Sequence, residues 1–139
     1  MIREGQPNSK IPEYLTAEDQ EMNAVILADL LEMEGISSEW AENGQRALEM
    51  FAQSEKGTFD AILMDMRMPV MDGLTAAREI RKLERPDAKT IPIIVLSADA
   101  FEENVKQCLL AGMNMHLSKP VEIDQLKDAL SRLIEYKIR

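Results

Sequence analysis

Reactive side chains follow short apolar segments of this chain, each at the point where an extended segment ends. Asp65 closes the run Phe59-Asp60-Ala61-Ile62-Leu63-Met64 and is followed by a proline and an Asp-Gly turn. A run of this length bounded by turn formers is typical of a buried strand. The pair Glu18-Asp19, the hydroxyl of Ser97 and the ammonium of Lys119 close three further extended segments. Because ligands bind at the carboxyl ends of strands in an open parallel sheet, we expect these groups to converge.

Three carboxylates and one ammonium in one place would leave a net charge of −2. Two carboxylates about 4 Å apart repel each other by about 1–4 kcal/mol, so such a cluster needs a cation. Oxygen-only ligands suit Mg²⁺, a hard ion that keeps several waters. Phosphoryl transfer needs mainly positioning and charge neutralisation, with a carboxylate such as Asp65 as nucleophile. The residues therefore predict a site that binds Mg²⁺ and takes up a phosphoryl group.

The bulk composition places the chain among single-domain globular proteins. Its 139 residues suffice for one core, and 45% hydrophobic with 29% charged residues is not a disordered composition. No apolar stretch approaches a membrane span and Met1–Gln6 opens no signal peptide, so we expect a cytoplasmic protein without direct membrane contact. The single cysteine, Cys108, cannot form an internal disulfide and is expected to be a small core residue.

The net charge of −9 is unevenly distributed. Nine of the 25 acidic residues lie between Ile11 and Gln45, a stretch without Lys or Arg. An acidic end repels polyanions, so nucleic-acid binding is not expected. Most of these side chains are interpreted as solvated helix faces. Glu18 and Asp19 are the exception, because an adjacent pair at a strand end has no helix surface to cover.

Extended and helical patterns alternate five times along the chain. The predicted strands are one that begins after Pro12, Ile36–Ala41, the segment ending at Asp65, Ile93–Ser97 and Met115–Ser118. The predicted helices carry their apolar faces at Met22/Ile26/Leu30/Met33, Ala47/Leu48/Phe51, Leu74/Ala77/Ile80, Phe101/Val105/Cys108/Leu109 and Ile123/Leu126/Leu130/Leu133/Ile134. Five strand–helix units predict an α/β fold with a parallel sheet covered on both faces. Residues 1–10 are interpreted as a linker and 11–139 as one domain.

Glycines and prolines mark the limits of these elements. Gly35 is expected to end the first helix and Gly112 to cap the fourth. The triplet Arg85-Pro86-Asp87 should break the third helix. Pro12 lacks the donor that a strand ladder needs, so the first strand should be short and begin after it.

The chain resembles the receiver domains of two-component response regulators, over nearly its whole length from about Ile11 to Tyr136. The matching residues at four successive strand ends are Glu18-Asp19, Asp65 with Met68-Pro69-Met71-Asp72-Gly73, Ser97-Ala98 and Lys119-Pro120. Two further stretches are most similar to receivers attached to hybrid sensor histidine kinases, namely Ala41-Glu42-Asn43-Gly44 and Ala111-Gly112-Met113-Asn114. The resemblance implies a flavodoxin-like, doubly wound, five-stranded parallel sheet of strand order 2-1-3-4-5 with five helices.

The resemblance also implies roles for the acidic cluster. Asp65 would accept a phosphoryl group from a histidine kinase or a histidine phosphotransfer domain. Asp19 and Asp65 would ligate Mg²⁺, with Glu18 acting through water. Arg67 would give the metal its backbone carbonyl, and Lys119 would pair with the phosphate.

Two more residues are implied to form a switch. Ser97 would hold a phosphoryl oxygen, and His116 takes the position of an aromatic that turns inward on activation. Their movement would shift the Ala98-Asp99-Ala100 loop and bias the face made by the fourth predicted helix, the last strand and the last helix. A partner or a second copy could read that face.

Alternative interpretations remain for single residues and for the function of the chain. An Asp at a strand end often caps the next loop, Ser97 could cap a helix beginning near Ala100, and Asp72-Gly73 is interpreted as turn chemistry.

A Mg²⁺-dependent phosphatase would also use Asp65 as nucleophile, but such enzymes usually carry a second Asp where this chain has Arg67. A flavodoxin-like cofactor module would need a phosphate-cradling glycine loop after the first strand, which is absent here. A phosphorylation-independent docking module would not need a complete site. Trp40, in the second predicted strand, is expected to lie too far from the acidic residues to report on metal binding.

Overall fold

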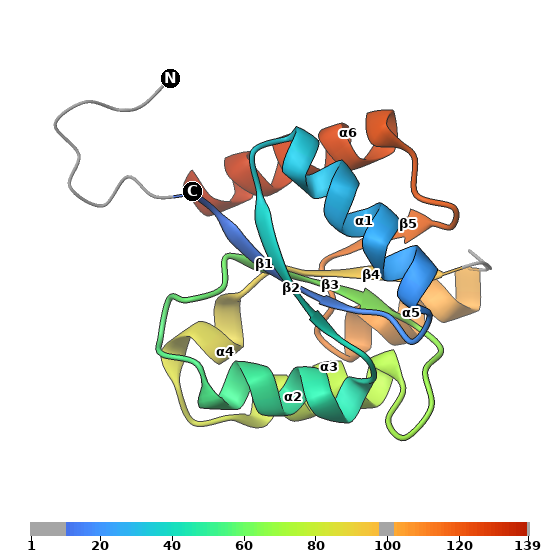
Figure 1. The fold of residues 1–139 in the computed structure, drawn as a ribbon. Helices are drawn as coiled ribbons and strands as arrows, with labels where there is room; N and C mark the ends of the chain where they lie inside the picture. Colours follow the sequence, from blue (N-terminus) through green and yellow to red (C-terminus); the bar gives the residue numbers. More distant parts are fainter. Residues whose placement is uncertain (1–10, 98–101, 139) are drawn as a thin grey trace, which may run out of the picture.

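The structure, a computed structural model, describes residues 11–97 and 102–138 (Figure 1). The predicted linker 1–10 lies outside this range. The strands are β1 (Glu13–Ala17), β2 (Ser37–Ala41), β3 (Ala61–Asp65), β4 (Ile93–Ser97) and β5 (Met115–Ser118). The helices are α1 (Glu21–Met33), α2 (Gly44–Gln53), α3 (Gly73–Lys82), α4 (Pro86–Thr90), α5 (Glu102–Leu110) and α6 (Ile123–Ile138).

The five strands form one parallel sheet in the order β2-β1-β3-β4-β5, which confirms the predicted topology. Helices α1 and α6 cover one face, and α2, α3, α4 and α5 cover the other (Figure 1). The strand order reverses between β1 and β3. Helix α1, which follows β1, lies on one face of the sheet, and α3, which follows β3, lies on the other. The crevice at the carboxyl ends of these two strands is where an open α/β sheet binds its ligands.

Alternate side chains of the central strands feed two separate cores. Ile62 and Met64 of β3 pack with Phe51 and Ile80 on the α2–α3 face. Leu63, between them, packs on the α1–α6 face. All five residues of β3 are buried, as expected for a central strand covered on both sides. Its last residue is Asp65, so the fold places a carboxylate at the end of a fully apolar strand.

The buried face of α1 differs from the predicted one. Ala24, Leu27 and Leu31 pack into the core, whereas Met22 and Ile26 of the predicted stripe are exposed. Met33 is exposed as well, and Leu30 is only partly buried. The prediction was wrong because α1 is apolar nearly all around, so two stripes with helical spacing compete. The position of the helix on the sheet selects between them.

The ends of the first two elements follow the predicted signals. β1 begins at Glu13, directly after Pro12. Gly35 has φ +77° and ends α1: its N–H donates to the Glu32 carbonyl, and the N–H of Ile36 donates to that of Leu31. This pair of bonds is a Schellman motif, in which a glycine accepts the left-handed conformation.

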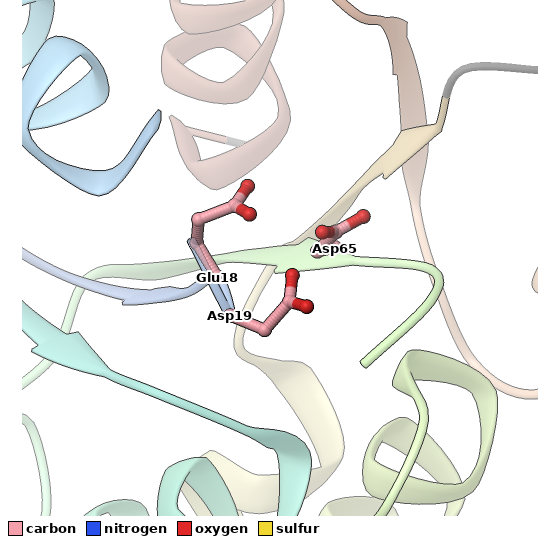
Figure 2. Close-up of side chains that lie close together, drawn as sticks. All are labelled: Glu18, Asp19 and Asp65. Carbon is pink, nitrogen blue, oxygen red and sulfur yellow. The ribbon is translucent and has the colours of Figure 1, made fainter. Parts of the chain in front are cut away.

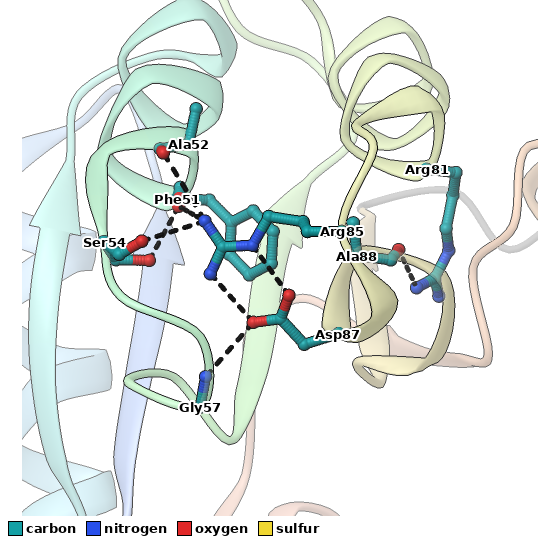
Figure 3. A network of polar contacts seen from close by, with 8 residues as sticks. All are labelled: Phe51, Ala52, Ser54, Gly57, Arg81, Arg85, Asp87 and Ala88. Atoms are coloured by element: carbon teal, nitrogen blue, oxygen red, sulfur yellow. Dashed lines mark hydrogen bonds and ion pairs between the residues drawn. The ribbon is translucent and has the colours of Figure 1, made fainter.

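The described residues form six helices where five were expected, because Pro86 begins a short additional helix after α3 has ended at Lys82. Proline is tolerated at the first helical position, where no N–H donor is required. The preceding residue, Arg85, anchors the short helix α4 to α2. Its guanidinium pairs with both carboxylate oxygens of Asp87 at 2.7 and 2.8 Å and donates to the Phe51 and Ser54 carbonyls (Figure 3).

None of the helices in the two described ranges is long and apolar enough to cross a membrane.

Candidate functional site

The three carboxylates named from the sequence meet at the carboxyl ends of β1 and β3. Ala17 and Met64 are register partners, so the residues that follow them are neighbours. One oxygen from each of Glu18, Asp19 and Asp65 lies within 4.8 Å of the others, and the side chains face a shared space (Figure 2). Glu18 and Asp65 are buried, with 2% and 4% of their surface exposed, while Asp19 is exposed.

Lys119 supplies the positive charge beside this cluster. Its Nζ lies 3.1 Å from Oδ2 of Asp65 and 3.3 Å from Oε1 of Glu18. Burial alone would lower the pKa of the lysine, but the two carboxylates outweigh it, so its pKa is raised and the ammonium is retained. The backbone N–H of Lys119 donates to the Ser97 carbonyl at 2.9 Å, which sets the lysine next to the end of β4.

One lysine does not neutralise the cluster. Burial raises the pKa of Glu18 above its usual range, and repulsion from Asp65 is the second-largest cause of this rise. Hydrogen bonds from the Gln20 N–H, at 3.1 Å to Oε2, and from Lys119 act in the opposite direction without cancelling that rise. A buried carboxylate with a raised pKa beside a second carboxylate gains from a further cation. The three-carboxylate donor set therefore fits a hard divalent ion.

Trp40 lies beside the acidic pair, contrary to the expectation that it would be too distant. Its indole Nε1 donates to the backbone carbonyl of Glu18 at 2.6 Å. The prediction was wrong because β2 runs parallel to β1, with Trp40 opposite Thr16, so that its side chain reaches toward the carboxyl end. Nothing in the spacing along the chain could reveal this contact, since it depends on the register between the two strands.

Close backbone approaches hold the loop that follows Asp65. The N–H of Met66 donates to the Leu96 carbonyl and the N–H of Gly73 to the Met66 carbonyl, at 2.8 and 3.0 Å. A Cβ on Gly73 would lie 2.3 Å from the Asp65 carbonyl oxygen, so only glycine fits there. Asp72 accepts from the Thr75 N–H at 2.8 Å and caps α3, in keeping with its interpretation as turn chemistry.

The middle of this loop contains a strained residue that the sequence did not reveal. Val70 has φ +70°, and the N–H of Met71 donates to the Pro69 carbonyl at 2.7 Å across it. This is the positive-φ form of the γ-turn, which is rare and unfavourable for a β-branched residue. The Met71 carbonyl in turn accepts from the Gly44 N–H at 3.0 Å, which ties the loop to the start of α2.

The remaining predicted site residues lie on β4, on β5 and in the loop after β3. Ser97 is buried at the end of β4, one residue beyond Leu96, the register partner of Asp65. His116 lies in β5 opposite Val95, on the sheet face that α5 covers. Arg67 is exposed at the start of the loop after β3. The roles given to these three residues stay predictions, and the Ala98-Asp99-Ala100 loop and any Ser97 cap near Ala100 lie outside the described residues.

A profile of the response regulator receiver domain family matches residues 15–131. The chain belongs to this family. The receiver is 41% identical over 121 residues to the hybrid signal transduction histidine kinase M of Dictyostelium discoideum, covering 86% of this chain and 5% of that protein. It is 35% identical to the osmosensing histidine protein kinase SLN1 of Saccharomyces cerevisiae, covering 94% of this chain and 11% of that protein. The chain therefore spans about a tenth or less of the length of these curated relatives.

Solved structures of receivers share the fold. The receiver domain of the sensor histidine kinase PA1611 from Pseudomonas aeruginosa PAO1 is 36% identical with a TM-score of 0.80, over 91% of this chain and 99% of that one. In that structure a magnesium ion is coordinated in the active-site cleft. The chemotaxis protein CheY4 of Vibrio cholerae is 25% identical with a TM-score of 0.81, over 89% and 99% of the two chains.

Proposed function

We propose that this receiver is a signalling switch that accepts a phosphoryl group on Asp65 from a phosphohistidine. A carboxylate oxygen of Asp65 would attack the phosphorus as the phosphorus–nitrogen bond breaks, and the imidazole would leave with the bond's electron pair. The observation that carries the proposal is the placement of Asp65: it lies at a strand end, with Lys119 at 3.1 Å and two further carboxylates within 4.8 Å.

The carboxylates of Asp19 and Asp65 would hold Mg²⁺ directly, with Glu18 acting through water and Arg67 contributing its carbonyl. The bound ion would neutralise charge on the transferring phosphoryl oxygens. Lys119 would move its ion pair from Asp65 to a phosphoryl oxygen, and the Ser97 hydroxyl would donate to another. The same groups would assist later hydrolysis of the acyl phosphate, so that the receiver regulates without turning over an external substrate.

The partner would be a histidine kinase or a histidine phosphotransfer domain that docks beside the site. An apolar groove adjoins Glu18 and Lys119 and is lined further by Ile26, Leu30 and Val121. Ile26 is 51% exposed and Met22, one turn away, is 75% exposed. This apolar surface continues directly into the acceptor site, which suits a partner that must place its phosphohistidine next to Asp65.

A second surface is proposed for the output. In the structure the fourth predicted helix is α5, which carries two exposed leucines, Leu109 at 57% and Leu110 at 86%. The proposed surface is the face formed by α5, β5 and α6. Phosphorylation would move Ser97 and His116 and shift the population of this face between two states, for a partner or a second copy to read.

The acceptor assignment is tested by intact mass after incubation with acetyl phosphate and Mg²⁺. We expect one phosphate adduct on the unmodified receiver and none on Asp65→Asn. Asp29→Asn is the matched control, since Asp29 is an exposed aspartate of α1 outside the acidic cluster, and it should be labelled fully. An adduct of equal yield on Asp65→Asn would overturn the proposal. Turnover of an external phosphate ester would instead favour the phosphatase alternative.

A further inference from the structure

Trp40 connects the edge strand β2 to the backbone of the acidic pair. Its indole N–H donates to the Glu18 carbonyl at 2.6 Å. The next residue of β2, Ala41, accepts from the Glu18 N–H at 3.0 Å. Both backbone groups of Glu18 are therefore bound by consecutive residues of β2, one through a main-chain bond and one through a side chain.

The bond from Trp40 acts on the peptide unit that leads into Asp19. A peptide unit is planar, so fixing the direction of the Glu18 carbonyl also fixes the direction in which the chain enters Asp19. Glu18 and Asp65 are buried and are further held by Lys119. Asp19 is exposed, so its carboxylate depends more on the orientation of its own backbone.

We propose that Trp40 is a positioning residue for the metal-binding carboxylates. Its indole N–H holds the Glu18–Asp19 peptide in the orientation that lets Asp19 share a cation with Asp65. The inference rests on the proposed Mg²⁺ site, and it assigns the effect to the N–H donor rather than to the bulk of the ring.

Two properties of Trp40 make the donor testable by itself. The residue lies on the edge strand and is 41% exposed, so replacing the indole by a phenyl ring disturbs little packing. Trp40→Phe keeps an aromatic ring and removes the N–H. Ser37→Ala is the matched control, because Ser37 is an exposed residue at the other end of β2. Asp19→Asn removes a proposed ligand directly.

The experiment is a calorimetric titration of each protein with Mg²⁺, with thermal unfolding in EDTA recorded beside it. We expect Trp40→Phe to bind Mg²⁺ about tenfold more weakly, the lower end of the range seen when a group that orients a metal ligand is removed. Ser37→Ala should bind as the unmodified receiver does, and Asp19→Asn should bind much more weakly than either. The unfolding temperature of Trp40→Phe in EDTA should stay close to that of the control.

A second measurement follows the donor in the unmodified protein. The sequence has one tryptophan, so a single indole N–H resonance reports on Trp40. It should shift on addition of Mg²⁺ and stay in place in Asp19→Asn. Equal Mg²⁺ affinity of Trp40→Phe and the unmodified receiver would overturn the inference while leaving the proposed function intact. No Mg²⁺ binding by the unmodified receiver would overturn both.

Discussion

The ammonium of Lys119 lies 3.1 Å from a carboxylate oxygen of Asp65, the residue proposed to accept the phosphoryl group. The same nitrogen is 3.3 Å from Glu18. Lys119 thus joins the two buried carboxylates, which otherwise repel each other, and its side chain is 25% exposed where theirs are 6% and 2% exposed. One lysine therefore has two tasks: it stabilises the resting fold and would be available to a phosphoryl oxygen.

Lys119→Met is expected to destabilise the receiver by about 2 kcal/mol near neutral pH, because it leaves two buried carboxylates without their ammonium. The pKa of Glu18, already raised by burial, would rise further. A carboxyl group whose pKa is higher in the folded than in the unfolded chain contributes stability below its unfolded pKa and loses it as pH rises through the folded one. The loss should therefore be larger at about pH 7.5 than at about pH 5 in urea unfolding with EDTA.

Lys82→Met is the matched control for this change. Lys82 is 70% exposed and pairs with Glu79 on the surface of α3, so its loss should change stability little at either pH. Adding Mg²⁺ should restore part of the stability that Lys119→Met loses relative to the unmodified receiver. In the control, the difference from the unmodified receiver should be the same with and without Mg²⁺. Equal losses in the two variants would show that Lys119 is an ordinary surface lysine.

The sequence predicted that these charged side chains meet because strand ends can be read locally. Apolar runs locate the strands, turn residues locate their ends, and a parallel sheet brings those ends together. These signals alone were enough to place Asp65, Glu18 and Lys119 together at one edge of the sheet. The strand limits of β4 and β5 and the start of β1 after Pro12 follow from the same signals.

The features that escaped prediction depend on register and packing. The choice between two apolar stripes of α1 is made by the sheet beneath it, and the contact of Trp40 with Glu18 by the pairing of β2 with β1. The anchor at Arg85 joins segments more than 30 residues apart, which periodicity does not report. The positive φ of Val70 is invisible for a different reason, since valine is not a residue that signals such a turn.

Val70→Asn is expected to stabilise the receiver by about 1 kcal/mol. The valine is 80% exposed, so little packing is lost, and asparagine adopts positive φ with less strain than a β-branched residue. Val25→Asn is the control: Val25 is 53% exposed in α1 and has an ordinary helical backbone, so no gain is expected there. Urea unfolding measures both. An unchanged midpoint for Val70→Asn would mean that the loop carries no strain at this residue.

Arg85→Lys is expected to lower stability by about 2 kcal/mol without affecting phosphorylation. A lysine keeps the charge but cannot pair with both oxygens of Asp87 while donating to the Phe51 and Ser54 carbonyls (Figure 3). The arginine also lies over the Phe51 ring, 4.6 Å from its centroid. Arg46→Lys, on the exposed side of α2, should have little effect. Intact mass after acetyl phosphate treatment should show equal labelling of all three proteins, and a loss of labelling in Arg85→Lys alone would contradict the purely structural role.

His116→Phe is expected to stabilise the receiver by about 1 kcal/mol near neutral pH, and by more as pH falls. Nε2 of His116 is buried and has no hydrogen-bond partner among the described residues, and burial lowers the pKa of the imidazole below its usual 6.5. His116, Asp128 and Arg132 line one surface hollow between β5 and α6, and Asp128 and Arg132 pair with each other at 3.2 Å. Because the folded pKa is the lower one, the stability tied to the neutral imidazole is complete above 6.5 and is lost as pH falls through the folded value. Unfolding of both proteins from about pH 8 to about pH 5 isolates this group, since other titrations cancel in the difference. A difference that stays constant over this range would show that the folded imidazole titrates as it does in the unfolded chain.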